Sequence, residues 1–468
     1  MRRPYRIAIS KHHHDQVAKH LLPGDGLEAA AILLCSRSSA NRLLVKYVVL
    51  VPHDVCKVRL PNQISWPGSA IESAIDIADS EHLSIILIHS HPGGMFDFST
   101  EDNDSDLKII PCLYQAISAE DIVHGSAIMT PDKAIRARIY NSDMSIDPVH
   151  FVVCSSDDID IWAPSSNGTV QKIPIAFSSE MRQDLKRLTA CIVGVSGTGS
   201  IVVEQLSRMG IGRLILIDFD RTEFKNLNRI LNSTIDDAKA GCFKTEMLAT
   251  KVLQHRNDIE ISCINSTISC RDSIVAAGDA DFLFCCVDSL EGRQICDQIS
   301  TAFLQPLFDV GVTIPTRSSS CGEPVIADVL GRIDYIYPGS PTLLDRCVYS
   351  PESLRNEYLR QTAPEDFNNQ VKEGYIKGIV DEAPSVITLN MKAASTCVME
   401  FLARRYQFRH EPNALFNRVI FSVAESYEEH ENLKNSELSP SEMMARGLEE
   451  PLLGMPCFQK LGSQEEAA

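Results

Sequence analysis

Two histidines and an aspartate in residues 89–102 have the types and spacing of a catalytic metal site. One residue separates His89 from His91, seven separate His91 from Ser99, and two separate Ser99 from Asp102. Two imidazoles and a carboxylate are three zinc ligands, which in catalytic sites leave a fourth position open for water. The pattern therefore predicts metal-assisted hydrolysis.

The segment just before the histidines indicates how both could reach one ion. Residues 83–88 are apolar and partly β-branched, which predicts a buried strand. Side chains two positions apart in a strand point the same way, so His89 and His91 at its end would face one metal. Asp102 would return from the following loop or the start of a helix.

With Pro92, Ser99 and Asp102 all in place, the pattern resembles the motif of the JAMM (JAB/MPN-type) metalloproteases. The resemblance implies a zinc ion held by His89, His91 and Asp102. It also implies an α/β metalloprotease domain around them.

The same resemblance implies a catalytic glutamate on an earlier helix, ahead of an apolar strand. Glu28 fits that position, because the apolar residues 32–35 follow it closely. Such a carboxylate takes a proton from water and returns it to the leaving amine. Ser99 would be a hydrogen-bond donor that supports the developing oxyanion.

Composition narrows the class of protein. The chain has 468 residues, 44% of them hydrophobic, and a formal net charge of −18, which argues against a general nucleic-acid binder. No run reaches about 18 consecutive apolar residues, so we expect no membrane span. The 15 cysteines include no C-x-x-C pair, which favours free thiols in a reducing cytoplasm.

A second pattern begins near residue 188. An apolar strand at 188–193 is followed by a glycine-containing loop, a helix over 201–209 and a second strand at 213–217. Glycines in such a loop let the backbone approach a phosphate at the helix N-terminus. Asp218 lies 24 residues after Gly194, a spacing at which a carboxylate meets a ribose hydroxyl. Alone, this loop would suggest NAD or FAD.

Further along the chain come Asp218-Phe219-Asp220, Glu223, the run Asn-Leu-Asn-Arg at 226–229, Lys244, and an apolar run at 284–288 that ends in Asp288. Together these motifs resemble the ThiF/MoeB family, the Rossmann-like adenylating domains of ubiquitin-activating-type enzymes. The resemblance covers roughly residues 180–405 and implies ATP and magnesium, with a homodimer as the usual assembly. Arg229 and Lys244 would neutralise the triphosphate and the transition state, Asp218 would bind ribose, and Asp288 would hold Mg²⁺. The nucleotide-binding residues implied are Gly194, Gly197, Gly199, Asp218, Asp220, Asn226, Arg229, Lys244 and Asp288.

The chain also departs from this family. Thr342 and Asp345 stand where many members have zinc-binding cysteines, so we expect no structural zinc. The family's arginine from an N-terminal helix has no clear match, with Arg182 and Arg187 as candidates. In the stretch 383–390, where a thioester-forming cysteine is often found, Ile387 stands instead. This leaves Cys347 as a tentative thioester cysteine, and an incidental thiol is an equal alternative.

We expect a JAMM domain at 1–153, a Ser/Asp/Pro-rich linker at 154–176, an adenylation domain at 177–425 with a loop-rich stretch at 340–380, and an acidic, mobile tail at 426–468. The interpretation is a bifunctional cytoplasmic enzyme. It would hydrolyse a peptide or isopeptide bond at the C-terminus of a ubiquitin-like protein and adenylate that protein's C-terminal glycine. A conjugating enzyme is a possible further partner.

Two alternatives stay open. One is the processing and adenylation of a sulfur-carrier protein for cofactor or cysteine synthesis. The other is a regulatory scaffold with a degenerate adenylation site, for which Ser196 and Ile230 leave room. By analogy alone, the fusion is similar to bacterial ubiquitin-like systems, some of them linked to antiviral defence.

Overall fold

The computed structural model describes residues 3–119, 122–165, 167–318, 324–372, 386–433 and 441–460. The chain divides into two compact units. Unit 1 consists of residues 1–173 together with 301–304 and 439–468, and unit 2 consists of residues 174–300 and 305–438. Each unit is α/β and has its own eight-stranded sheet.

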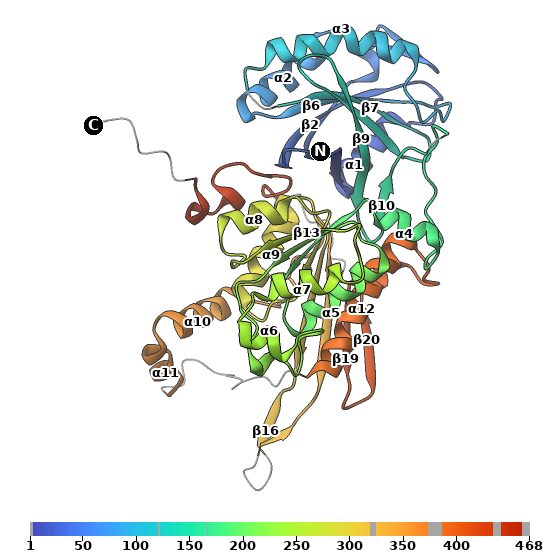
Figure 1. Ribbon diagram of the computed structural model, residues 1–468. Coiled ribbons are helices and arrows are strands. Elements are labelled where there is room, and N and C mark those ends of the chain that lie inside the picture. Colours follow the sequence, from blue (N-terminus) through green and yellow to red (C-terminus); the bar gives the residue numbers. More distant parts are fainter. Residues whose placement is uncertain are drawn as a thin grey trace, which may run out of the picture. The chain divides into compact units, whose positions relative to one another are not determined.

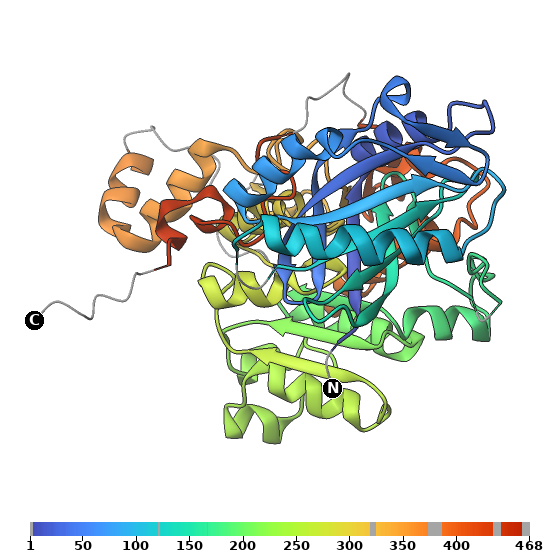
Figure 2. The same cartoon turned by 90° about the horizontal axis from the view of Figure 1, so that it is seen from above.

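Unit 1 places a mixed sheet between helices (Figure 1). The strand order is β1-β3-β2-β6-β7-β8-β9-β10, and β1 also pairs with β9, so the sheet curls back on itself. Figure 2 shows α3 lying across the strands of this sheet. Its elements are β1 (Tyr5–Ser10), α1 (Lys11–Leu21), β2 (Ala30–Ser39), β3 (Arg42–Leu50), β4 (Val58–Leu60), β5 (Gln63–Ser65), α2 (Ser69–Glu81), β6 (Ser84–Ser90), α3 (Thr100–Ala116), β7 (His124–Met129), β8 (Ile135–Tyr140), β9 (Ile146–Ser155) and β10 (Ile159–Trp162).

The apolar run of β2 is continuous because the strand is buried on both faces. Ala31 and Leu33 pack in one core with residues of α1, while Ile32 and Leu34 pack in a second core with residues of α2 and α3. Alternate side chains of a strand point to opposite faces, so one strand serves both cores. The predicted strand at 83–88 is confirmed as β6, which pairs with β2.

The expected linker and tail differ from the structure. Residues 154–162 are not a linker, because β9 continues to Ser155 and β10 pairs with it antiparallel. Residues 426–468 are not one mobile tail either. Tyr427–Glu431 forms β20, and the segment 441–460 packs within unit 1 with Leu452 and Leu453 buried.

Unit 2 has the strand order β13-β12-β11-β14-β15-β18-β19-β20. The first five strands in this order pair in parallel, and β18, β19 and β20 are added by antiparallel pairings. The Rossmann-like fold class is therefore confirmed. The elements are α4 (Ser179–Leu185), β11 (Thr189–Val193), α5 (Gly197–Met209), β12 (Arg213–Ile217), α6 (Ile235–Ala240), α7 (Lys244–Leu253), β13 (Glu260–Ile264), α8 (Arg271–Gly278), β14 (Phe282–Cys285), α9 (Leu290–Ala302), β15 (Leu307–Thr313), β16 (Thr316–Ser318), β17 (Pro324–Ile326), β18 (Leu330–Ile336), α10 (Pro351–Thr362), α11 (Pro364–Lys372), α12 (Ile387–Tyr406), β19 (Arg418–Ser422) and β20 (Tyr427–Glu431).

The stretch 340–380 was expected to be irregular, but two helices occupy much of it (Figure 1). Ser350 caps α10, and Pro351 takes the first helical position, where its missing N–H costs nothing. Residues 373–385 lie outside the described residues. Within the part of the chain that the structure describes, no helix has both the length and the apolarity to cross a membrane.

Candidate metal and nucleotide sites

The three predicted metal ligands converge at the end of β6. The Nε2 atoms of His89 and His91 lie 3.1 Å apart. Asp102 Oδ1 is 3.1 Å from His89 Nε2, and Asp102 Oδ2 is 3.3 Å from His91 Nε2. Tetrahedral ligands about 2.0–2.1 Å from zinc would be separated by roughly 3.3 Å, so this donor set fits one zinc ion.

Local structure holds each ligand in place. His91 Nδ1 contacts the carbonyl of Met95 at 2.8 Å, which leaves its other nitrogen for the site. Asp102 lies in the first turn of α3, as expected. Its Oδ2 accepts a hydrogen bond from Ser99 N–H at 2.7 Å, and its own N–H donates to Ser99 Oγ at 3.1 Å. The SxxD spacing is therefore that of a helix-capping box.

A buried arginine fixes the helix that carries Asp102. Arg138 on β8 donates to Asp106 Oδ2 from Nη2 at 2.7 Å and to Asn103 Oδ1 from Nη1 at 2.5 Å. Both acceptors lie in the first two turns of α3. Because a buried guanidinium with several partners is hard to displace, this contact restrains the position of Asp102.

Glu28 lies beside the ligands but not in a helix. It stands in the extended segment just before β2, and its carboxylate comes within 4.8 Å of the ligand atoms of His89 and His91. The expectation of an earlier helix was wrong here, because α1 ends at Leu21 and two turn glycines follow. Burial raises the pKa of Glu28, against the lowering effect of the two histidines.

Charge complementarity is strong among the ligands. Burial opposes ionisation of Asp102, but hydrogen bonds from His89 and His91 outweigh it and lower the pKa of the carboxyl. Burial also lowers the pKa of His91, and its bonds to Asp102 and Met95 reverse this into a net rise. Without an ion, the imidazolium and carboxylate charges therefore stabilise each other.

The candidate nucleotide site lies at the end of β11, between β12 and β14. Gly194 has φ +80°, and a Cβ there would come 2.9 Å from the carbonyl oxygen of Cys286. A Cβ on Gly199 would lie 1.9 Å from the carbonyl oxygen of Gly194. These positions need glycine because the loop passes this close to backbone at the start of α5. The sheet's strand order reverses here, where ligands of such folds bind.

Acidic and basic side chains surround this loop. Asp218 is buried, and its two oxygens accept N–H groups of Val195 and Asp220 at 2.9 and 2.8 Å. Burial raises the pKa of Asp218. Lys244, at the start of α7, is buried and its Nζ lies 2.5 Å from Asp220 Oδ2. The structure thus brings three of the predicted nucleotide-binding residues together.

The other predicted residues of this site differ in burial and in their distance from the glycine loop. Arg229 lies over the loop, since a Cβ on Gly197 would be 3.5 Å from its Cδ. Asn226 is buried and its Oδ1 accepts Glu223 N–H at 3.0 Å, so its side chain serves the local turn. Asp288 is exposed in the loop between β14 and α9. Arg182 donates to the carbonyl of Arg208, at the far end of α5 from the glycine loop.

Asn390 was not predicted to belong to the site. It lies in α12, buried against the glycine loop, with Oδ1 accepting from Thr198 Oγ1 at 3.4 Å. A Cβ on Gly197 would lie 2.4 Å from its Nδ2. The prediction for residues 383–390 concerned only the position of a thioester-forming cysteine. Residues 383–385 lie outside the described residues. A lone asparagine nearly 200 positions from the loop gave no local signal.

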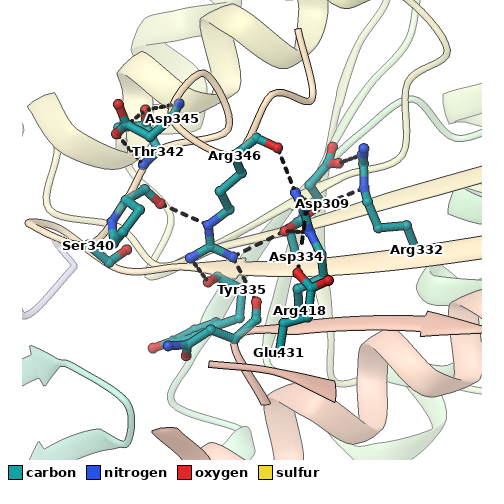
Figure 3. A network of polar contacts seen from close by, with 12 residues as sticks. Asp309, Arg332, Asp334, Tyr335, Ser340, Thr342, Asp345, Arg346, Arg418 and Glu431 are labelled. Atoms are coloured by element: carbon teal, nitrogen blue, oxygen red, sulfur yellow. Dashed lines mark hydrogen bonds and ion pairs between the residues drawn. The ribbon is translucent and has the colours of Figure 1, made fainter. Parts of the chain in front are cut away.

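A chain of ion pairs joins β15, β18 and the loop that precedes Cys347 (Figure 3). Asp309 on β15 and Asp334 on β18 are fully buried and directly opposite each other. Arg332 lies 2.5 Å from the first and 2.8 Å from the second. The remaining links are Arg346 and Arg418 on Asp334, and Arg293, which pairs with Asp309 and donates to the carbonyl of Val287.

The positions where the family often has cysteines belong to the same neighbourhood. Thr342 N–H and Oγ1 each donate to Asp345 Oδ2 at 2.8 Å, which closes a turn just before Arg346 (Figure 3). Cys347 follows, exposed and with φ +57°. In this chain polar contacts and a buried arginine hold the loop.

Comparisons with known proteins match both units. The model of the ThiF family matches residues 171–420, and the model for prokaryotic homologs of the JAB domain matches residues 10–138. Ubiquitin-like modifier-activating enzyme 5 of Bombyx mori is 29% identical over 168 residues, 34% of this chain and 39% of the relative. The Caenorhabditis elegans protein of that name is 30% identical over 166 residues, 33% of this chain and 36% of the relative.

The chain thus spans less than two fifths of the length of these relatives. Among solved structures, that of E. coli MccB with MccA-N7isoASN is 21% identical, covers 55% of this chain and 67% of its own, and has a TM-score of 0.43. The structure of PaaA is 18% identical, covers 55% and 76% of the two chains, and has a TM-score of 0.38.

Proposed function

The chain belongs to the ThiF family and carries a JAB domain ahead of its ThiF domain, and from this we propose that it is a two-site enzyme acting on the C-terminus of a ubiquitin-like protein. The JAB domain would be a zinc-dependent peptidase or isopeptidase that cleaves the bond after the terminal glycine. The ThiF domain would adenylate the carboxylate so exposed. The matched relatives, named as ubiquitin-like modifier-activating enzymes, support this substrate class.

The observation that carries the peptidase half is the convergence of His89, His91 and Asp102 within 3.3 Å of one another beside Glu28. These three residues would hold the zinc ion. When bound there, zinc would act as a Lewis acid and lower the pKa of a water molecule.

Glu28 would then move the proton. Its raised pKa makes it a stronger base than an exposed glutamate, suited to take a proton from water and release it to the leaving amine. Ser99 keeps its O–H donor available, because its Oγ accepts from Asp102 N–H in the capping box. That donor would support the oxyanion of the substrate carbonyl.

In the ThiF domain, the carboxylate oxygen would attack the α-phosphorus of ATP, and the bond to pyrophosphate would break. Backbone N–H groups of the loop from Gly194 to Gly199 would bind the phosphates at the start of α5. Asp218 would accept the ribose hydroxyl with its remaining lone pairs, since its two backbone bonds fix its orientation.

Arg229 and Lys244 would offset the charge that builds up on pyrophosphate. Lys244 is paired with Asp220, so its buried side chain has an anionic partner at this site. Asp288, exposed beside the loop, would hold Mg²⁺ with the phosphate oxygens. Asn390 is a further candidate contact at the phosphate loop.

Cys347 would be the acceptor of an activated C-terminus. Its exposure supports that role, and replacement by serine would test it. Loss of a reducible thioester with pyrophosphate exchange intact is the expected result. A thioester that survives in Cys347→Ser would assign it to another cysteine, and no thioester in the wild type would mean adenylation alone.

The test of the peptidase half uses zinc content and cleavage of a ubiquitin-like protein with a short C-terminal extension. Glu28→Ala should retain zinc and cleave at least about 100-fold more slowly, because general bases contribute roughly 10²- to 10⁴-fold. His89→Ala should lose both zinc and cleavage. Unchanged cleavage in Glu28→Ala would remove Glu28 from the mechanism.

A further inference from the structure

Arg59 makes direct contact with the main chain of Glu28. Arg59 lies in β4, the first strand of a two-stranded hairpin with β5. Its Nε donates to the carbonyl oxygen of Glu28 at 3.0 Å. The N–H of Glu28 in turn donates to the carbonyl oxygen of Leu60 at 2.9 Å. Both polar main-chain groups of Glu28 are therefore bound by neighbouring residues of one strand.

The same guanidinium also reaches the turn before Glu28. Arg59 Nη1 lies 2.6 Å from Asp25 Oδ2, and Asp25 Oδ1 accepts Leu27 N–H at 3.0 Å. The hydrogen bond from Arg59 lowers the pKa of Asp25. Asp25 stands between two glycines with positive φ, Gly24 and Gly26, so the turn has little local restraint of its own. One side chain thus holds the turn and the catalytic segment.

A second anchor acts on the residue after Glu28. Ala29 N–H donates to Ser90 Oγ, and Ser90 N–H donates to the carbonyl of Ala29, each at 2.9 Å. Ser90 lies between His89 and His91, so this pair ties the segment to the metal-binding strand. The segment is therefore bound on one side to Ser90 of β6 and on the other side to the hairpin. Among these described contacts, Arg59 supplies the only side chain on the hairpin side.

We propose that Arg59 is a positioning residue, which sets the distance between the Glu28 carboxylate and the metal ligands by fixing both sides of the Glu28 peptide. The proposal rests on the peptidase function assigned above. Its chemical requirement is a donor pair that serves two acceptors at once, Glu28 O and Asp25 Oδ2. A guanidinium has this geometry and an ammonium does not.

The test compares Arg59→Ala, Arg59→Lys and the control Lys57→Ala in the full chain. Lys57 is an exposed cation two residues earlier in the chain, where it leads into the same hairpin. The probe is a ubiquitin-like protein with a fluorogenic amide on its C-terminal glycine. Arg59→Ala should lower kcat about 10- to 100-fold with KM and zinc stoichiometry unchanged, because small misplacements of a catalytic group cost this much. Lys57→Ala should match the wild type.

Arg59→Lys distinguishes geometry from charge. It keeps a cation for Asp25, but its single nitrogen cannot replace the separated Nε and Nη1 donors, so kcat should stay at least about 10-fold low. Hydrogen exchange gives a readout that needs no activity: amides of residues 25–29 should exchange faster in both Arg59 variants than in Lys57→Ala.

A fully active Arg59→Lys, or unchanged exchange at 25–29 in Arg59→Ala, would overturn the proposal. If the wild type cleaves no substrate while zinc is bound, the peptidase function fails. In that case the exchange measurement alone decides whether Arg59 holds the segment.

Discussion

At the scale of single residues, ion pairs with arginines stabilise two buried carboxylates of unit 2. Asp309 and Asp334 are both fully buried and face each other across β15 and β18, an arrangement that repels unless cations intervene. Four arginines, Arg293, Arg332, Arg346 and Arg418, supply them. Arg293 lowers the pKa of Asp309 against the opposing effect of burial. Removing one arginine would leave a buried charge short of a partner.

Asp297 is a buried carboxyl beside the hydroxyl of Tyr349. Burial raises its pKa from 3.8 to about 6, although the hydroxyl of Tyr349 donates to it at 2.8 Å. Between pH 4 and pH 6 the folded state therefore holds a proton that the unfolded state releases. The stability from this group is present below about pH 4 and is lost as the pH rises through 6.

We predict that Asp297→Asn, which cannot titrate, becomes the more stable form at neutral pH. The difference in unfolding free energy between wild type and variant should shift by about 2 kcal/mol in favour of wild type on going from pH 7 to pH 4. Urea unfolding at several pH values measures it. A difference that does not change with pH would contradict the buried, proton-binding carboxyl.

At the scale of elements, the glycine loop depends on close backbone contact. Gly199→Ala should abolish ATP binding and lower the melting temperature, because its Cβ would lie 1.9 Å from the carbonyl oxygen of Gly194. Gly241, with φ +59° and no atom within 4 Å of a Cβ, is the matched control. Its alanine variant should cost about 1–2 kcal/mol and keep ATP affinity. Nucleotide titration with equal losses in both variants would contradict this account of the loop.

The C-terminal segment gives a second element-scale prediction. The N–H of Leu448 donates to the carbonyl of Arg37 at 2.9 Å, and Glu449 pairs with Lys46. Leu453→Ala should destabilise unit 1 by about 2–5 kcal/mol, as for other buried leucines, and the exposed Gln459→Ala by less than about 0.5 kcal/mol. Chemical denaturation separates the two. If both variants lowered the unfolding free energy by less than about 0.5 kcal/mol, the segment would not pack against unit 1.

How far the sequence predicted these features depended on whether the signal was local. The metal ligands follow from an i, i+2 pair at the end of an apolar strand and from the spacing of Ser99 and Asp102 in the JAMM pattern, all within 14 residues. Arg59 and Asn390 reach their sites from distant segments, and no local pattern marks them. The polar composition after residue 426 predicted a mobile tail. The prediction failed because β20 and the buried Leu452 and Leu453 need only a few apolar residues to order this part of the chain.

At the scale of the whole molecule, the product of the reaction proposed for unit 1 is the substrate of the reaction proposed for unit 2. Hydrolysis produces a C-terminal carboxylate, and adenylation consumes one. The two sites use separate residues, so each should be removable alone. Glu28→Ala should leave adenylation of an already processed substrate intact, and Lys244→Ala should leave cleavage intact.

ATP–pyrophosphate exchange with a ubiquitin-like protein, offered either mature or with a C-terminal extension, tests the central claim most directly. The wild type should exchange with both forms. Glu28→Ala should exchange with the mature form alone, because it cannot expose the terminal glycine of the extended one. Exchange by Glu28→Ala with the extended form, or no exchange by the wild type with either, would contradict the account.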